Sequence, residues 1–101
     1  MRFYITWHND QTAFPTNREE RAKLGVSLVE MVKADMKAGL TKDWGASASG
    51  RGGYAIYEAT SETAIGEALQ KYRPYIVFDS VEPIITADQV IESFKKATAK
   101  K

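Results

Sequence analysis

The chain has 101 residues, of which 44% are hydrophobic and 27% charged, which is the size and composition of a single globular domain, so we predict one domain over residues 1–101. A formal net charge of +1 gives no general attraction to polyanions, and the absence of cysteine excludes a disulfide framework, a thiolate zinc site and a cysteine nucleophile. We find neither a secretory signal nor a window approaching the roughly 18 apolar residues that span a bilayer, so we expect a cytoplasmic protein with no membrane partner.

The first part of the chain predicts a strand and a long helix. Residues 2–8 alternate apolar and more polar side chains, which is the period of a half-buried strand. Thr16 or Asn17 can cap the helix that follows, because glutamates stand three residues further on. From residue 18 to about residue 38, apolar side chains recur at helical spacing. Asp35 is the exception, since it projects inside the apolar arc.

The middle of the chain predicts a hairpin. Residues 42–49 are typical of a strand of small side chains, and residues 50–53, Gly-Arg-Gly-Gly, are typical of a turn. The aromatic and β-branched run that begins at Tyr54 predicts the returning strand.

The last part predicts a helix, a strand and a final helix. The first helix begins after Ser61 and ends at Pro74, and residues 75–85 form the fourth strand, in which Pro83 favours an edge or a bulge. Thr86 caps the final helix, which has one apolar side that must dock on something, and we expect the lysines near its end, Lys100 and Lys101 included, to fray. The apolar side consists of Val90, Ile91, Phe94 and Ala97.

This order of elements predicts an α+β fold of the ferredoxin-like type. The pattern βαββαβ plus a C-terminal helix gives a four-stranded antiparallel sheet with both crossover helices on one face. The other face is then bare, and the fourth strand carries apolar side chains on both sides. We therefore expect the sheet of a second copy to cover it, making a homodimer or a higher oligomer.

The chain resembles the dimeric α/β-barrel superfamily, and its layout is most similar to that of muconolactone isomerase. The matching features are Met1-Arg2-Phe3, Trp44 leading into Gly50 to Gly53, Tyr54 to Tyr57, Ala68-Leu69, and Pro74-Tyr75 leading into Val81 and Pro83. The resemblance covers nearly the whole chain and implies two subunits with their sheets face to face. It also implies isomerisation or cofactor-independent oxygenation of a small molecule, without metal or organic cofactor.

Two residues are candidate catalytic bases. His8, the only histidine, ends the first strand beside a carboxylate, and an imidazole there can act as a general base near neutral pH. Its alternative role is that of a polar strand-end residue. Asp35 is either a buried carboxylate facing a cavity between helix and sheet or one half of a structural ion pair.

Five further residues are candidates for substrate binding. Arg51, in the Gly-rich turn, can hold an anion together with backbone amides, although a plain hairpin turn explains the same residues. The aromatic residues are candidate walls for a cyclic substrate, and core packing is the alternative. These are Trp7, Trp44, Tyr54 and Tyr57.

Three classes of function follow. The first is a cofactor-independent enzyme or binding protein for a small cyclic or carboxylated molecule, and the sequence leaves open whether it is catalytic. The second is a non-catalytic homo-oligomeric protein whose last helix is a docking surface. The third is an RNA-binding module, because the same order of elements builds RNA-recognition domains; the near-neutral charge argues against a nucleic-acid partner.

Overall fold

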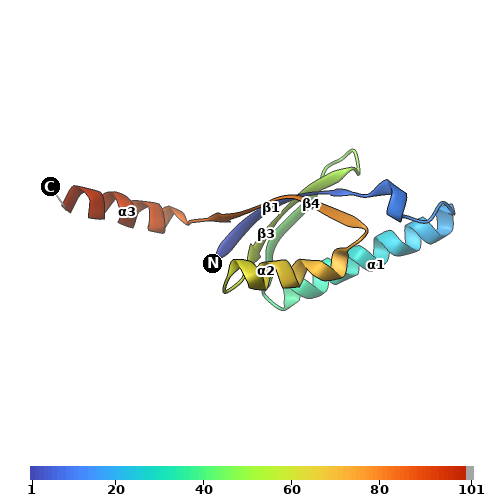
Figure 1. Cartoon of the computed structure of the whole chain (residues 1–101), viewed down its shortest axis with the longest axis horizontal. Coiled ribbons are helices and arrows are strands. Elements are labelled where there is room, and N and C mark those ends of the chain that lie inside the picture. Colours follow the sequence, from blue (N-terminus) through green and yellow to red (C-terminus); the bar gives the residue numbers. More distant parts are fainter. Residues whose placement is uncertain (100–101) are drawn as a thin grey trace.

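A computed structural model describes residues 1–99 and gives the predicted order of strands and α-helices (Figure 1). The elements are β1 (Arg2–Asn9), η1 (Gln11–Ala13), α1 (Arg18–Lys37), β2 (Thr41–Ala46), β3 (Gly52–Glu58), α2 (Glu62–Leu69), η2 (Gln70–Tyr72), β4 (Ile76–Ile84) and α3 (Ala87–Ala99). Lys100 and Lys101 lie outside the described residues.

The four strands form one antiparallel sheet in the order β2-β3-β1-β4. Helices α1 and α2 lie on the same side of this sheet, which we call the helix face (Figure 1). The opposite side is called the open face. The α+β fold and its ferredoxin-like layout are therefore confirmed.

The core lies between the helix face and α2. The alternation expected for β1 is confirmed, because Phe3, Ile5 and Trp7 are buried and the residues between them are more exposed. Phe3 and Ile5 pack with residues of β3 and with Ile65 and Leu69 of α2. Burying each such side chain contributes about 1.5–3 kcal/mol to folding.

Helix α1 starts and packs as its sequence predicts. The side chain of Asn17 accepts a hydrogen bond from the backbone N–H of Glu20, which satisfies one of the free donors at the helix start. Leu28 and Val32 face the sheet and pack against Tyr72. Asp35 is buried with them and is 3% exposed.

Strand β2 is shorter than predicted. It ends at Ala46, and two of the three glycines of the predicted turn, Gly52 and Gly53, belong to β3. A Cβ on Gly53 would collide with the carbonyl oxygen of Gly45, and one on Gly52 with that of Trp7. These glycines therefore allow close approach of strands, while Gly50, with φ of 76°, makes the turn.

Strand β4 contains a bulge that breaks its simple alternation. The register between β1 and β4 shifts between Thr6 and Trp7. Before the shift Phe78 pairs with Trp7, and after it Ser80 pairs with Thr6. Directly paired residues share a face, so Phe78 lies on the helix face and Ser80 on the open face.

Helix α3 stands away from the rest of the chain at the end of an extended segment (Figure 1). It gives the protein a length of 64 Å, against 25 and 21 Å in the other two directions. Phe94 is 70% exposed and Ile91 is 48% exposed. The expected apolar side is thus present, and it is uncovered within residues 1–99. No helix in this part of the chain is long and apolar enough to cross a membrane.

Candidate functional site

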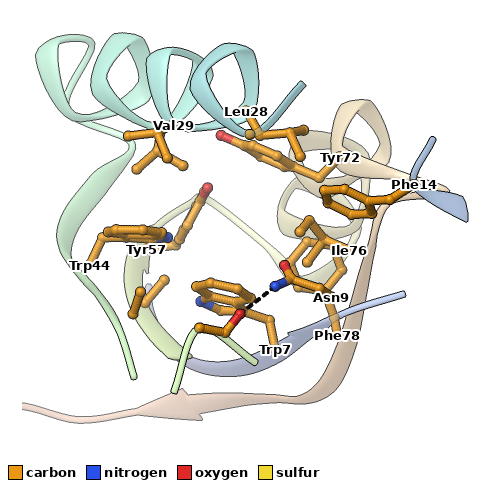
Figure 2. A pocket seen from close by; sticks show the side chains of 15 residues that line it. Trp7, Asn9, Phe14, Leu28, Val29, Trp44, Tyr57, Tyr72, Ile76 and Phe78 are labelled. Carbon is orange, nitrogen blue, oxygen red and sulfur yellow. Dashed lines mark hydrogen bonds between the residues drawn. The ribbon is translucent and has the colours of Figure 1, made fainter. Parts of the chain in front are cut away.

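A cavity of about 220 Å³ lies between α1 and the helix face of the sheet (Figure 2). Its aromatic walls are Trp7, Phe14, Trp44, Tyr57, Tyr72 and Phe78. Aliphatic side chains from α1 and β4, including Leu28, Val29, Val32 and Ile76, complete it. A pocket with apolar walls and a few polar groups is the usual form of a small-molecule site.

The two tryptophans of the chain both line this cavity. The rings of Trp7 and Trp44 stack with centroids 5.5 Å apart and an angle of 15° between their planes. The indole Nε1 of Trp7 donates a hydrogen bond to the carbonyl oxygen of Tyr54 at 3.2 Å, which fixes the orientation of its ring. Three of the predicted wall residues, Trp7, Trp44 and Tyr57, are therefore brought together.

A buried polar network adjoins the cavity and is centred on Asp35. The ammonium of Lys71 forms an ion pair with Oδ1 of Asp35. The hydroxyl of Tyr72 donates to Oδ2 at 2.6 Å, and the hydroxyl of Tyr57 donates to the same oxygen at 3.4 Å. Both interpretations made of Asp35 thus apply in part: it forms an ion pair with a lysine, and two of its partners line the cavity.

The tyrosine hydroxyls of this network are held in their neutral form. Burial raises the pKa of Tyr72 above its usual value, and the hydrogen bond to the Asp35 carboxylate raises it further. Burial is also the main cause that raises the pKa of Tyr57, and the negative charge of Asp35 adds to it. Near neutral pH both phenols are therefore hydrogen-bond donors.

Thr41 adds an unusual feature to the same region. It pairs with Tyr57 across β2 and β3 and is 2% exposed. Its hydroxyl is the only buried side-chain polar atom within residues 1–99 without a hydrogen-bond partner. An unsatisfied buried hydroxyl is costly, so it marks a place where a polar partner is expected.

Asn9 supplies a polar group on another wall of the cavity. Its side-chain Nδ2 donates to the carbonyl oxygen of Gly50 at 2.7 Å, the bond drawn in Figure 2. The amide oxygen of Asn9 is then left to accept a hydrogen bond from a ligand or from water.

His8 lies on the open face of the sheet, away from the cavity. Its Nδ1 is 2.9 Å from each carboxylate oxygen of Asp79, and both side chains are 48% exposed. The bulge in β4 is what places Asp79 on this face. The structure therefore separates the two candidate bases, His8 and Asp35, on opposite sides of the sheet.

Tyr54 and Arg51 also lie outside the cavity. The hydroxyl of Tyr54 donates to Asp43 at 2.8 Å on the open face, and this bond is the main cause that raises the pKa of Tyr54. Arg51 is exposed in the turn before β3 and is not among the lining residues. Within residues 1–99, no cluster of three or more His, Asp or Glu side chains is arranged to hold a metal ion.

Sequence reasoning missed Lys71, Tyr72 and Asn9 as members of the site. Tyr72 falls within the helix predicted between Ser61 and Pro74, and the carboxylate of Asp35 inside an apolar arc is the one signal that a buried partner exists. Nothing in the spacing of residues points to Lys71, because η2 brings it to α1 only through the tertiary fold.

The arrangement favours binding and hydrogen-bond donation over direct base catalysis. Lys71 occupies Oδ1 of Asp35, and the two tyrosines occupy Oδ2. A ligand in the cavity therefore meets the Tyr57 or Tyr72 side chain before it meets the carboxylate. A proton exchanged between Asp35 and a ligand in the cavity would pass through a phenol.

A protein-family model, described as a domain of unknown function (DUF3303), matches residues 1–98. No curated protein matches the sequence significantly.

Proposed function

The chain belongs to the DUF3303 family, a family of unknown function, and we propose that it is a homodimeric protein that binds a small cyclic, largely apolar molecule. The observation that carries this proposal is the cavity of about 220 Å³ between α1 and the sheet. Both tryptophans and two tyrosines of the chain form its walls.

The size of the cavity sets the size of the ligand. An engineered apolar cavity of about 150 Å³ is known to hold benzene. The cavity here is somewhat larger, so it suits one ring with a substituent or a compact pair of fused rings. Apolar walls favour such a molecule because its burial removes apolar surface from water.

A narrower proposal concerns the reaction that the protein would catalyse if the ligand in the cavity is a substrate. The resemblance to the dimeric α/β-barrel superfamily implies isomerisation or cofactor-independent oxygenation. The network around Asp35 supports a role for Tyr57 as a hydrogen-bond or proton donor. His8 and Arg51, which lie outside the cavity, have no part in this proposal.

A homodimer of the dimeric α/β-barrel type is supported by the open face. Tyr4 is 38% exposed and Val77 is 39% exposed there, beside polar groups that are already paired with each other. A sheet with apolar side chains on both faces buries the second face most simply against another copy.

The test of ligand binding uses the indole signals of Trp7 and Trp44. In a ¹H–¹⁵N spectrum these are the two indole N–H groups of the chain, and both residues line the cavity. We expect small aromatic molecules to shift both signals in a saturable manner. Shifts confined to the backbone of the open face would contradict the proposal.

A matched pair of variants locates the binding site. A side chain at Gly25 would enter open space at the cavity wall, so Gly25→Leu should fill the cavity and abolish the indole shifts. Gly66→Leu makes the same change in α2, also into open space but outside this cavity, and should leave the shifts intact. Equal effects of the two variants would count against the cavity as the site.

A non-catalytic homo-oligomeric protein is the second candidate, and α3 is the observation that favours it. An amphipathic helix whose apolar side is uncovered needs a docking partner. Purified protein that forms a stable dimer and shifts neither indole signal with any small ring molecule would favour this candidate.

RNA binding is the candidate that the open face supports least. Four carboxylates lie on that face; one of them is paired with Arg2 and the N-terminal amine, and the other three would repel phosphates. The four are Asp43, Glu58, Asp79 and Glu82. Retention of labelled RNA at physiological salt would reverse this ranking.

A further inference from the structure

The charges around the cavity restrict the ligand that it accepts. No lysine, arginine or histidine side chain is among the lining residues. The nearest cation that the polar network offers is Lys71, and its ammonium is already paired with Asp35. A ligand whose negative charge lies inside the cavity would therefore have no counter-charge, which is strongly unfavourable.

The hydrogen bonds of Tyr57 show which polar group the cavity offers instead. Tyr72 donates to Asp35 at 2.6 Å, whereas Tyr57 donates to the same oxygen at 3.4 Å. The longer bond is near the limit for a hydrogen bond and is the weaker of the two. If Tyr57 turned its proton to a ligand, Asp35 would keep both Lys71 and Tyr72.

Thr41 indicates that the hydroxyl of Tyr57 would act as a hydrogen-bond donor to the ligand. Its buried hydroxyl has no partner and belongs to the residue that pairs with Tyr57. The Thr41 hydroxyl lies close enough to the Tyr57 phenol to lower its pKa in part, so it can donate to the phenol oxygen and leave the phenol proton for a ligand oxygen. Figure 2 shows the Tyr57 hydroxyl extending from the sheet towards α1, between Val29 and Tyr72.

We infer that the cavity selects an uncharged ring molecule that carries a carbonyl group, and that the hydroxyl of Tyr57 donates a hydrogen bond to this carbonyl. The inference rests on the proposed function of the same cavity and adds the chemical class of its ligand. It assigns Tyr57 as the residue that recognises the polar group and excludes carboxylates as preferred ligands. Asp35 then acts as a positioning residue, because its negative charge helps to keep the phenol of Tyr57 neutral, and Lys71 and Tyr72 hold Asp35 in place.

The experiment uses three probes of similar size and the full-length chain. Acetophenone has a ring and a carbonyl, ethylbenzene has a ring and no acceptor, and benzoate has a ring and a negative charge. Each is titrated against the indole signals of Trp7 and Trp44 at pH 7. We expect benzoate to bind at least about tenfold more weakly than acetophenone, because its charge stays unpaired.

Two conservative variants isolate the hydrogen bond. Tyr57→Phe should weaken acetophenone about fivefold, the effect of one neutral hydrogen bond, and leave ethylbenzene unchanged. Tyr54→Phe removes a hydroxyl on the open face and should change neither affinity. Both changes keep the aromatic ring, and Asp35 retains Lys71 and Tyr72 in the first, so both variants should fold.

The possible results separate the inference from the proposed function. Equal effects of Tyr57→Phe on acetophenone and ethylbenzene, or none on either, would overturn the inference while cavity binding stands. Benzoate binding as tightly as acetophenone would overturn the selection for uncharged ligands. If none of the three probes shifts an indole signal, the proposed function and the inference fall together.

Discussion

Lys71 and Asp35 form an ion pair that ties η2 to α1 beside the cavity. The two partners differ in their surroundings, because the Asp35 side chain is 5% exposed and the Lys71 side chain is 43% exposed. The carboxylate therefore depends on its partners, whereas the ammonium can reach water if the pair is broken.

The first prediction follows from this asymmetry. Lys71→Met should lower the free energy of unfolding by about 2 kcal/mol, because a buried carboxylate loses a charged hydrogen-bond partner. Lys23→Met is the control, since its ion pair with Glu19 joins side chains that are 77% and 82% exposed; it should cost less than about 0.5 kcal/mol. Urea denaturation measures both, and equal costs would contradict a special role for Lys71.

The second prediction concerns the unpartnered hydroxyl of Thr41. Thr41→Val should leave the free energy of unfolding unchanged or raise it by up to about 1 kcal/mol, because no hydrogen bond within the chain is lost. Thr6→Val makes the same change where the hydroxyl is 2.6 Å from that of Ser80, and it should cost about 1 kcal/mol. Thermal or urea unfolding compares the two variants, and a costly Thr41→Val would indicate that its hydroxyl is bonded in solution.

The third prediction uses the raised pKa values of the tyrosines. Because the folded state raises the pKa of Tyr72 and Tyr57 above the usual 10.0, it favours their neutral forms. The resulting stabilisation is fully present below pH 10 and is lost as the pH rises above that value. Absorbance at the tyrosinate band should therefore stay below that of urea-unfolded protein above pH 10, until the protein unfolds.

A variant assigns that effect to the network. Tyr72→Phe removes one of the buried phenols and should reduce the difference between the folded and unfolded titration curves. Identical curves for folded and unfolded wild-type protein would show that the phenols are open to hydroxide, and the buried network would then be wrong.

Much of the fold could be predicted because local patterns agree with it. The alternation of β1 and the helical spacing of α1 each reflect a single face turned to the core. The bulge in β4 could not be predicted from the sequence. Either set of alternate residues around Asp79 contains apolar side chains that could face the helices, so the pattern does not show where the register shifts. This one shift decides that Asp79 meets His8 on the open face.

The site was predicted only in part for a similar reason. Trp7, Trp44 and Tyr57 all fall on strand positions that alternate towards the helices, so their meeting follows from the sheet. Tyr54 is three residues from Tyr57 in β3, and side chains alternate between the two faces along a strand. Tyr54 therefore lies on the open face, opposite to Tyr57. The contact of Lys71 with Asp35 joins residues 36 positions apart in sequence, and no periodic signal connects them.

The last prediction concerns α3 and the proposed homodimer. If the apolar side of α3 docks on a second copy, Phe94→Ser should weaken the dimer, because a side chain that is 70% exposed in the single chain would be buried in the pair. Lys96→Ser is the control, since it places a serine on the opposite side of α3 and costs at least as much helix propensity as Phe94→Ser. Light scattering after size exclusion, over a range of protein concentrations, gives the mass of each variant.

A monomeric wild-type protein would contradict the proposed dimeric barrel. A dimer that is equally stable in both variants would show that α3 has no role in the interface, and the open face of the sheet would then be the interface.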